Sequence, residues 1–170
     1  MMILMHDLEQ PMQPAALSLA DEEVLSKAVE DAPWGDHLLS MLDLEEGWLD
    51  GTTGSPIKPA VAMFTHQILA FCDEHGILEP GVFPSPDGDA LLEWHVENRR
   101  ITTIDIELVE ASDGEPEVRW TAYDYVEDPR HEIYRDYSRD SAMELVWFLT
   151  EVAPRRGIMP QGLPPEEDAA

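Results

Sequence analysis

The segment FPSPDGDALLEWHVENRR, residues 83–100, decides the fold of this chain. Its proline-rich start leads into Asp87-Gly88, a turn dipeptide in which glycine supplies a positive φ without steric cost. From Ala90 onward apolar and polar residues alternate, as in a strand with one buried face. The segment therefore predicts a β-hairpin. A calcium loop would need more oxygen ligands than the carboxylates of Asp87 and Asp89 supply.

Two later segments, 101–110 and 117–125, show the same alternation and follow turn-forming residues. Together the segments predict an antiparallel meander with one face buried and the other facing water. A short edge strand at Val82-Phe83 extends this to three to four strands over about residues 82–125. The residues expected on the buried face are Leu92, Trp94, Val96, Ile104, Ile106, Leu108, Val118, Trp120 and Ala122.

Helical periodicity and capping residues predict four helices. Ser18 is expected to cap the first helix, and Ser55-Pro56 is expected to begin the third. The expected helices cover about residues 18–32, 34–45, 56–75 and 139–152. The apolar face expected for the last helix carries Met143, Val146, Trp147, Leu149 and Thr150. Because helices and strands are segregated along the chain, the sequence predicts an α+β fold with the helices packed on one face of the sheet.

The expected domain organisation is simple. Residues 1–17 form an N-terminal arm, residues 18–153 form a single α+β domain, and residues 154–170 form a disordered, acidic and proline-rich tail. A chain of 170 residues is long enough to bury one core of ordinary size.

The charge of the chain is its most unusual property. Asp and Glu number 36 against 10 Lys and Arg, which gives a formal net charge of -26. Such a chain repels phosphate backbones and anionic lipids, so direct binding of nucleic acid or membrane is not expected. A basic surface on a protein partner, such as a nucleic-acid-binding protein, is the expected target. The alternative is that the charge serves solubility or adaptation to high salt.

The single Cys72 leaves no internal disulfide and too few thiols for a cysteine-based zinc site. Cys72 is expected to be a small core residue, and His66 and His75 point apart on one helix and cannot share a metal. The sequence shows no signal peptide and no run of about 18 apolar residues. A cytoplasmic location, no cofactor and no metal are therefore expected.

Polar residues on the water-facing side of the sheet are the candidate binding site. Three strands contribute Glu93, His95, Asp105, Glu107, Arg119 and Tyr123, which we expect within one patch of about 10 to 15 Å. Two carboxylates with a histidine would suit acid/base catalysis or a metal. The favoured alternative is a solvated surface on which Arg119 pairs with a carboxylate, because this face lacks apolar neighbours that would shift a pKa.

Tyrosines add a second candidate contact surface. Tyr123, Tyr125, Tyr134 and Tyr137 lie in a stretch that mixes aromatic residues with charges of both signs. Tyrosine is favoured at protein interfaces. The sequence contains none of the common catalytic or nucleotide-binding motifs.

Residues 46–108 resemble a pattern found in small, uncharacterised bacterial proteins, in which a W-D-G loop and a helix precede P-x-P-x-G-x-x-x-E-W and a strand. The matching stretches are GWLDG at 47–51 and PSPDGDALLEW at 84–94. Leu49 stands between Trp48 and Asp50, which departs from the pattern. The resemblance implies one α+β unit of bacterial origin and no catalytic residue.

These observations favour a non-enzymatic acidic interaction protein that binds a basic surface, as an antitoxin, an immunity protein or an inhibitor does. A nucleic-acid mimic is the sharper form of this hypothesis. One alternative is a small acid/base or metal-assisted enzyme that uses the water-facing sheet residues. Another is an accessory subunit that contacts a larger assembly through exposed aromatic residues, namely Trp34 and the four tyrosines.

Overall fold

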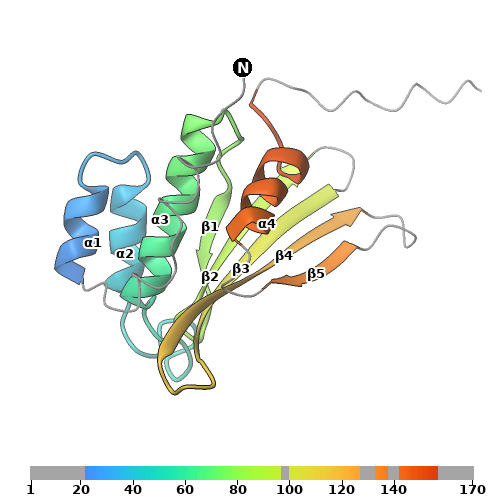
Figure 1. Cartoon of the computed structure of the whole chain (residues 1–170). Coiled ribbons are helices and arrows are strands. Elements are labelled where there is room, and N and C mark those ends of the chain that lie inside the picture. The colour runs from blue at the N-terminus through green and yellow to red at the C-terminus, as the bar shows by residue number, and fades with distance from the viewer. Residues whose placement is uncertain (1–21, 97–99, 127–132, 138–141, 157–170) are drawn as a thin grey trace, which may run out of the picture.

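The computed structural model describes residues 22–96, 100–126, 133–137 and 142–156. Figure 1 shows a curved antiparallel sheet flanked by helices. The helices are α1 (Glu22–Val29), α2 (Gly35–Leu42), α3 (Pro59–Glu74) and α4 (Ala142–Trp147). The strands are β1 (Gly81–Pro84), β2 (Ala90–Val96), β3 (Arg100–Glu110), β4 (Pro116–Val126) and β5 (Ile133–Tyr137), and they pair in this order. The α+β class and the antiparallel meander are confirmed.

The two faces of the sheet differ sharply in burial, as the alternation predicts. On the inner face Leu92, Ile104 and Ala122 are paired neighbours and all are buried. Trp94 and Trp120 lie on the same face and are almost fully buried. Helix α3 contacts β2, β3 and β4, and the buried side chains of helices and strands form one core cluster. This core fixes which strand residues face away from the helices.

The Asp87-Gly88 turn packs against the segment that precedes α3. Gly88 has a φ of +78°, and a Cβ atom there would lie 2.7 Å from the carbonyl oxygen of Pro56. The Lys58 amide donates to Gly88 O at 2.9 Å, and Lys58 Nζ lies 3.0 Å from Asp89 Oδ1. The acidic turn thus belongs to the hairpin, as the sequence predicts, and it also anchors the hairpin to the segment before α3.

Helix α3 begins later than the sequence predicts. Ser55 does not cap it; the Ser55 amide donates instead to Pro86 O at 2.8 Å. Lys58 is extended, with ψ of 137°, and Pro59 takes the first helical position. The residue before a proline is disfavoured in the α region, so Lys58 marks the boundary. The amides of Ile57 and Lys58 bond to other parts of the chain rather than to the helix.

The loop between α2 and α3 is compact. Asp50 Oδ1 accepts hydrogen bonds from the Thr52 amide at 2.9 Å and the Thr53 amide at 2.6 Å. These hydrogen bonds lower the pKa of Asp50 to about 2, and the bond from the Thr52 amide has the largest effect. The Trp48 indole donates to Ser55 O at 3.0 Å and packs over Gly54.

Helices α1 and α2 pack against α3, and α2 also contacts the sheet edge. His37 of α2 lies with Nε2 2.9 Å from the carbonyl oxygen of Val82 in β1. Because a carbonyl only accepts, Nε2 is the donor. This bond satisfies one backbone group of an edge strand, which is otherwise open to unwanted pairing.

The C-terminal helix presents a different face from the expected one. Leu145, Phe148 and Leu149 are buried, whereas Met143 is 60% exposed and Trp147 is 45% exposed. The five residues Phe148–Val152 form a π-helical turn, whose wider spacing rotates the residues that follow relative to an ideal α-helix. Leu78 N then donates to Pro154 O at 2.7 Å, which ties this end to the segment after α3.

Strand β5 extends the meander beyond the expected residue 125. It pairs with β4, so the described sheet has five strands. The expected arm, residues 1–17, lies outside the described residues, as do residues 157–170 of the expected tail.

Candidate functional site

The outer face of the sheet is the candidate site. All of its described side chains are half-buried or exposed, in contrast to the buried inner face. The strands keep the expected alternation, so the predicted candidates do share this face. We define the outer sheet face by Phe83, Leu91, Glu93, His95, Ile101, Thr103, Asp105, Glu107, Val109, Glu117, Arg119, Thr121 and Tyr123.

Glu93 and His95 contact each other directly on β2, through Glu93 Oε1 and His95 Nε2. The His95 side chain is 69% exposed and the Glu93 side chain 22% exposed. Both residues lie on one strand, two positions apart, so their pairing follows from the strand period. A contact this exposed contributes little to stability.

Asp105 is the carboxylate of the outer sheet face whose pKa responds to its surroundings. It lies opposite Leu91 on β2 and Thr121 on β4. Partial burial raises the pKa of the Asp105 carboxyl, and the negative charge of Glu107 makes a smaller contribution in the same direction. The expectation that this face lacks apolar neighbours is therefore wrong. The strand register brings Leu91 beside Asp105, and alternation within one strand does not reveal that pairing.

Arg119 does not form the expected ion pair. It lies opposite Glu107 in the β3–β4 register, yet no ion pair joins it to a carboxylate within the described part of the chain. Its Nε atom is buried and has no hydrogen-bond partner there. A buried guanidinium donor without an acceptor is costly, so Arg119 has the capacity to bind an additional group.

The candidate residues form a long diagonal band rather than one compact patch. Glu93 pairs with Thr103, His95 is opposite Ile101 on β3, and Glu107 lies further along the same strand. The distance along β3 from Ile101 to Glu107 is about 20 Å at the rise per residue of a β-strand. Within the described ranges no group of three or more His, Cys, Asp or Glu residues could hold a metal ion.

Apolar side chains are the part of this face that the sequence reasoning missed. Phe83 is 48% exposed and pairs with Leu91, while Ile101 and Val109 are half-buried on β3. The Phe83 ring lies over Gly81, where a Cβ atom would come within 2.9 Å of it. The sequence could have shown these residues, because the alternation of each strand turns them toward the outer face. The face thus combines carboxylates with apolar area.

Of the four candidate tyrosines, Tyr123 has a described side chain and is half-buried on the outer sheet face. In the backbone register Tyr123 pairs with Tyr134, Tyr125 with Ile101, and Tyr137 with Trp120. Tyr123 and Tyr134 therefore occupy neighbouring positions on β4 and β5. The side chains of Tyr125, Tyr134 and Tyr137 lie outside the described set.

Cys72 and the two histidines of the α3 region behave as expected. Cys72 is buried, and its burial raises the pKa of the thiol to about 12, far from that of a nucleophile. His66 accepts a hydrogen bond from Trp34, and His75 stacks on Phe71 with ring centroids 4.0 Å apart. The two histidines thus have separate partners.

Comparison with protein-family models, with curated proteins and with solved structures gives no significant match. Among the described helices, none has both the length and the apolar character that a transmembrane segment needs.

Proposed function

We propose that this chain is a non-enzymatic, strongly acidic interaction protein that binds a basic surface of a protein partner through its outer sheet face. An antitoxin, an immunity protein and an inhibitor act in this way, and a nucleic-acid mimic is the sharper form. The observation that carries the proposal is the composition of this open face. Glu93, Asp105 and Glu107 lie on the same face as the exposed ring of Phe83 and as Leu91, which is opposite Asp105 in the register.

Asp105 explains why a basic partner suits this face. Its carboxylate is already partly desolvated, so a Lys or Arg side chain brought next to it would stabilise the charged form. The apolar neighbours would supply contact area that the charges alone lack. The net charge of -26 would speed the encounter with a basic surface.

The partner class follows from the same charge. Basic surfaces are common on nucleic-acid-binding proteins, whereas nucleic acid and anionic membrane carry the same sign as this chain. We therefore propose a nucleic-acid-binding protein as the partner, in the cytoplasm, with no direct contact to nucleic acid or lipid.

A pull-down from the native host at about 50 mM and about 500 mM salt tests the proposal, because salt screens exposed charges strongly over this range. We expect a basic protein that is retained at low salt and released at high salt. Retention of the same partner at both concentrations would contradict the proposal and favour the accessory-subunit alternative.

The contact between Glu93 and His95 is the one observation that favours an acid/base enzyme as a second candidate. A carboxylate that contacts an imidazole can hold the ring in position for proton transfer. Activity in a hydrolase screen that disappears in both Glu93→Gln and His95→Ala, while Glu117→Gln retains it, would favour this candidate.

A further inference from the structure

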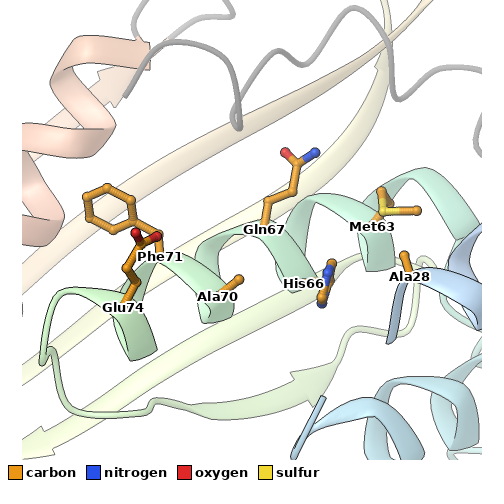
Figure 2. Close-up of a pocket in the computed structure, with 7 residues that line it drawn as sticks. All are labelled: Ala28, Met63, His66, Gln67, Ala70, Phe71 and Glu74. Atoms are coloured by element: carbon orange, nitrogen blue, oxygen red, sulfur yellow. The ribbon is translucent and has the colours of Figure 1, made fainter. Parts of the chain in front are cut away.

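A hollow of about 350 Å³ lies along one side of α3 (Figure 2), away from the residues of the outer sheet face. Its volume is at the lower end of the range for ligand pockets, so it suits a small molecule. Ala28 of α1 lines one end, and the other lining residues follow one another at helical spacing along α3. The lining residues on α3 are Met63, His66, Gln67, Ala70, Phe71 and Glu74.

Two polar groups near one end of the hollow lack partners. The Trp34 indole N–H donates to His66 Nδ1 at 3.0 Å, so the ring proton resides on Nε2, which is a free donor among the described residues. Gln67 Oε1 is buried and accepts no hydrogen bond within the described part. Leaving a buried acceptor unsatisfied costs about 1–3 kcal/mol. A ligand hydroxyl can donate to such an acceptor or accept from such a donor.

The opposite end of the hollow is acidic. Glu74 is exposed and follows His66 by eight positions, which is about 12 Å along the helix axis. The side chains between these ends are those of Ala70 and Phe71, which are apolar. No Lys or Arg lines the hollow. A positive charge is therefore favoured at the Glu74 end, as the net charge of the chain also favours.

We propose that this hollow binds a small organic ammonium ion with an aromatic body and a hydroxyl group at its far end. The ammonium group pairs with Glu74, and the aromatic body lies against Ala70 and Phe71 (Figure 2). The hydroxyl group bonds to Gln67 or His66. This inference is independent of the outer sheet face and of the function proposed for it.

Tyramine is a suitable probe, because it carries an ammonium group and a phenol at opposite ends of a short aromatic body. NMR titration of the full chain would compare it with tyrosol, which lacks the charge, and with 4-hydroxyphenylacetate, which reverses it. We expect millimolar binding of tyramine, at least fivefold weaker binding of tyrosol, and no measurable binding of the anion. Equal binding of all three, or no binding of tyramine, would overturn the proposal.

Two variants test the location. Ala70→Leu fills the hollow from a half-buried position and should abolish tyramine binding. Glu74→Gln keeps the size of the side chain and should weaken tyramine binding two- to fivefold, the range for an exposed ion pair. Glu144→Gln, which removes an exposed acid of α4 outside the hollow, is the matched control. Equal affinities of Glu74→Gln and Glu144→Gln would show that the ammonium group does not bind at Glu74.

Discussion

The indole N–H of Trp34 donates a hydrogen bond to Nδ1 of His66 at 3.0 Å, and this bond joins the start of α2 to the middle of α3. Trp34 is buried, so the expectation that it is an exposed contact residue is wrong, and His66 is half-buried. The bond requires an unprotonated Nδ1, and burial lowers the pKa of His66 from its ordinary value of 6.5. The folded chain therefore keeps His66 neutral where an unfolded chain would begin to protonate it.

This relationship predicts a loss of stability in mild acid. The unfolded state takes up a proton near pH 6.5, whereas folded His66 does so only at lower pH. The stabilising contribution is complete above pH 6.5 and is lost as the pH falls through the folded pKa. Urea unfolding at pH 7.5 and pH 5.5 should show a smaller decrease for His66→Gln, which can still accept from Trp34 but does not titrate. Equal decreases in the two proteins would contradict this account.

Gly88 should be the most sensitive glycine of the hairpin turns. Gly88→Ala combines a φ of +78° with a contact of 2.7 Å to the Pro56 carbonyl oxygen, so both the backbone strain and the docking of the turn are affected. We expect a loss of about 2–4 kcal/mol in the free energy of unfolding. Gly114→Ala is the control, because its φ is +81° but its nearest neighbour, a Glu110 side-chain atom, lies at 3.8 Å.

Gly114→Ala should therefore cost only about 1–2 kcal/mol, the penalty for a positive φ alone. Urea denaturation of both variants measures the difference. If the two variants lose the same stability, the packing of the Asp87-Gly88 turn against Pro56 contributes nothing.

Asp105→Asn should stabilise the free protein at neutral pH. Because the folded pKa of Asp105 lies above its ordinary value of 3.8, the charged carboxylate is disfavoured in the folded state at pH 7. The penalty disappears as the pH falls towards and below 3.8, where the group is protonated. We expect a gain below about 1 kcal/mol, since Asp105 is partly exposed and solvent screens its charge.

The measurement is the difference in urea midpoint between Asp105→Asn and the wild type, at pH 7 and at pH 4.5. Glu117→Gln, on the same face of β4, should show no such gain. A loss of stability in Asp105→Asn at pH 7 would mean that the carboxylate has a favourable partner in the free protein.

The sequence predicted the faces of the sheet because burial with a period of two is a property of each strand alone. It could not predict register, which depends on pairing between strands, so the placement of Leu91 beside Asp105 was missed. For the same reason the sequence could not predict how far the candidate residues extend along the sheet. The paired side chains of Glu93 and His95 followed directly from the strand period.

Helix boundaries were less predictable, because tertiary hydrogen bonds compete with local signals. Ser55 has the residue type of an N-cap, but its amide bonds to Pro86 O and Pro59 begins the helix. Leu145, Phe148 and Leu149 are buried at positions i, i+3 and i+4, whereas the equally apolar Met143 and Trp147 are exposed. Which of the two overlapping apolar stripes of this helix faces the core depends on its packing, which its sequence does not report. The hollow on α3 depends on what neighbouring helices leave uncovered, and no sequence pattern reports that.

The claim that this protein acts through the carboxylates of its outer sheet face is tested most directly by the salt dependence of partner binding. The triple variant Glu93→Gln, Asp105→Asn and Glu107→Gln removes three charges from that face. A control variant with three substitutions, Glu22→Gln, Glu30→Gln and Glu144→Gln, removes three charges from exposed positions in and beside α1 and α4.

The Kd for the partner recovered at low salt would be measured for both triple variants and the wild type between about 50 mM and 500 mM salt. The account predicts at least a tenfold weaker Kd and a shallower salt dependence for the face triple, with the control within twofold of the wild type. Equal effects of the two triples would contradict it, because net charge rather than this face would then govern binding.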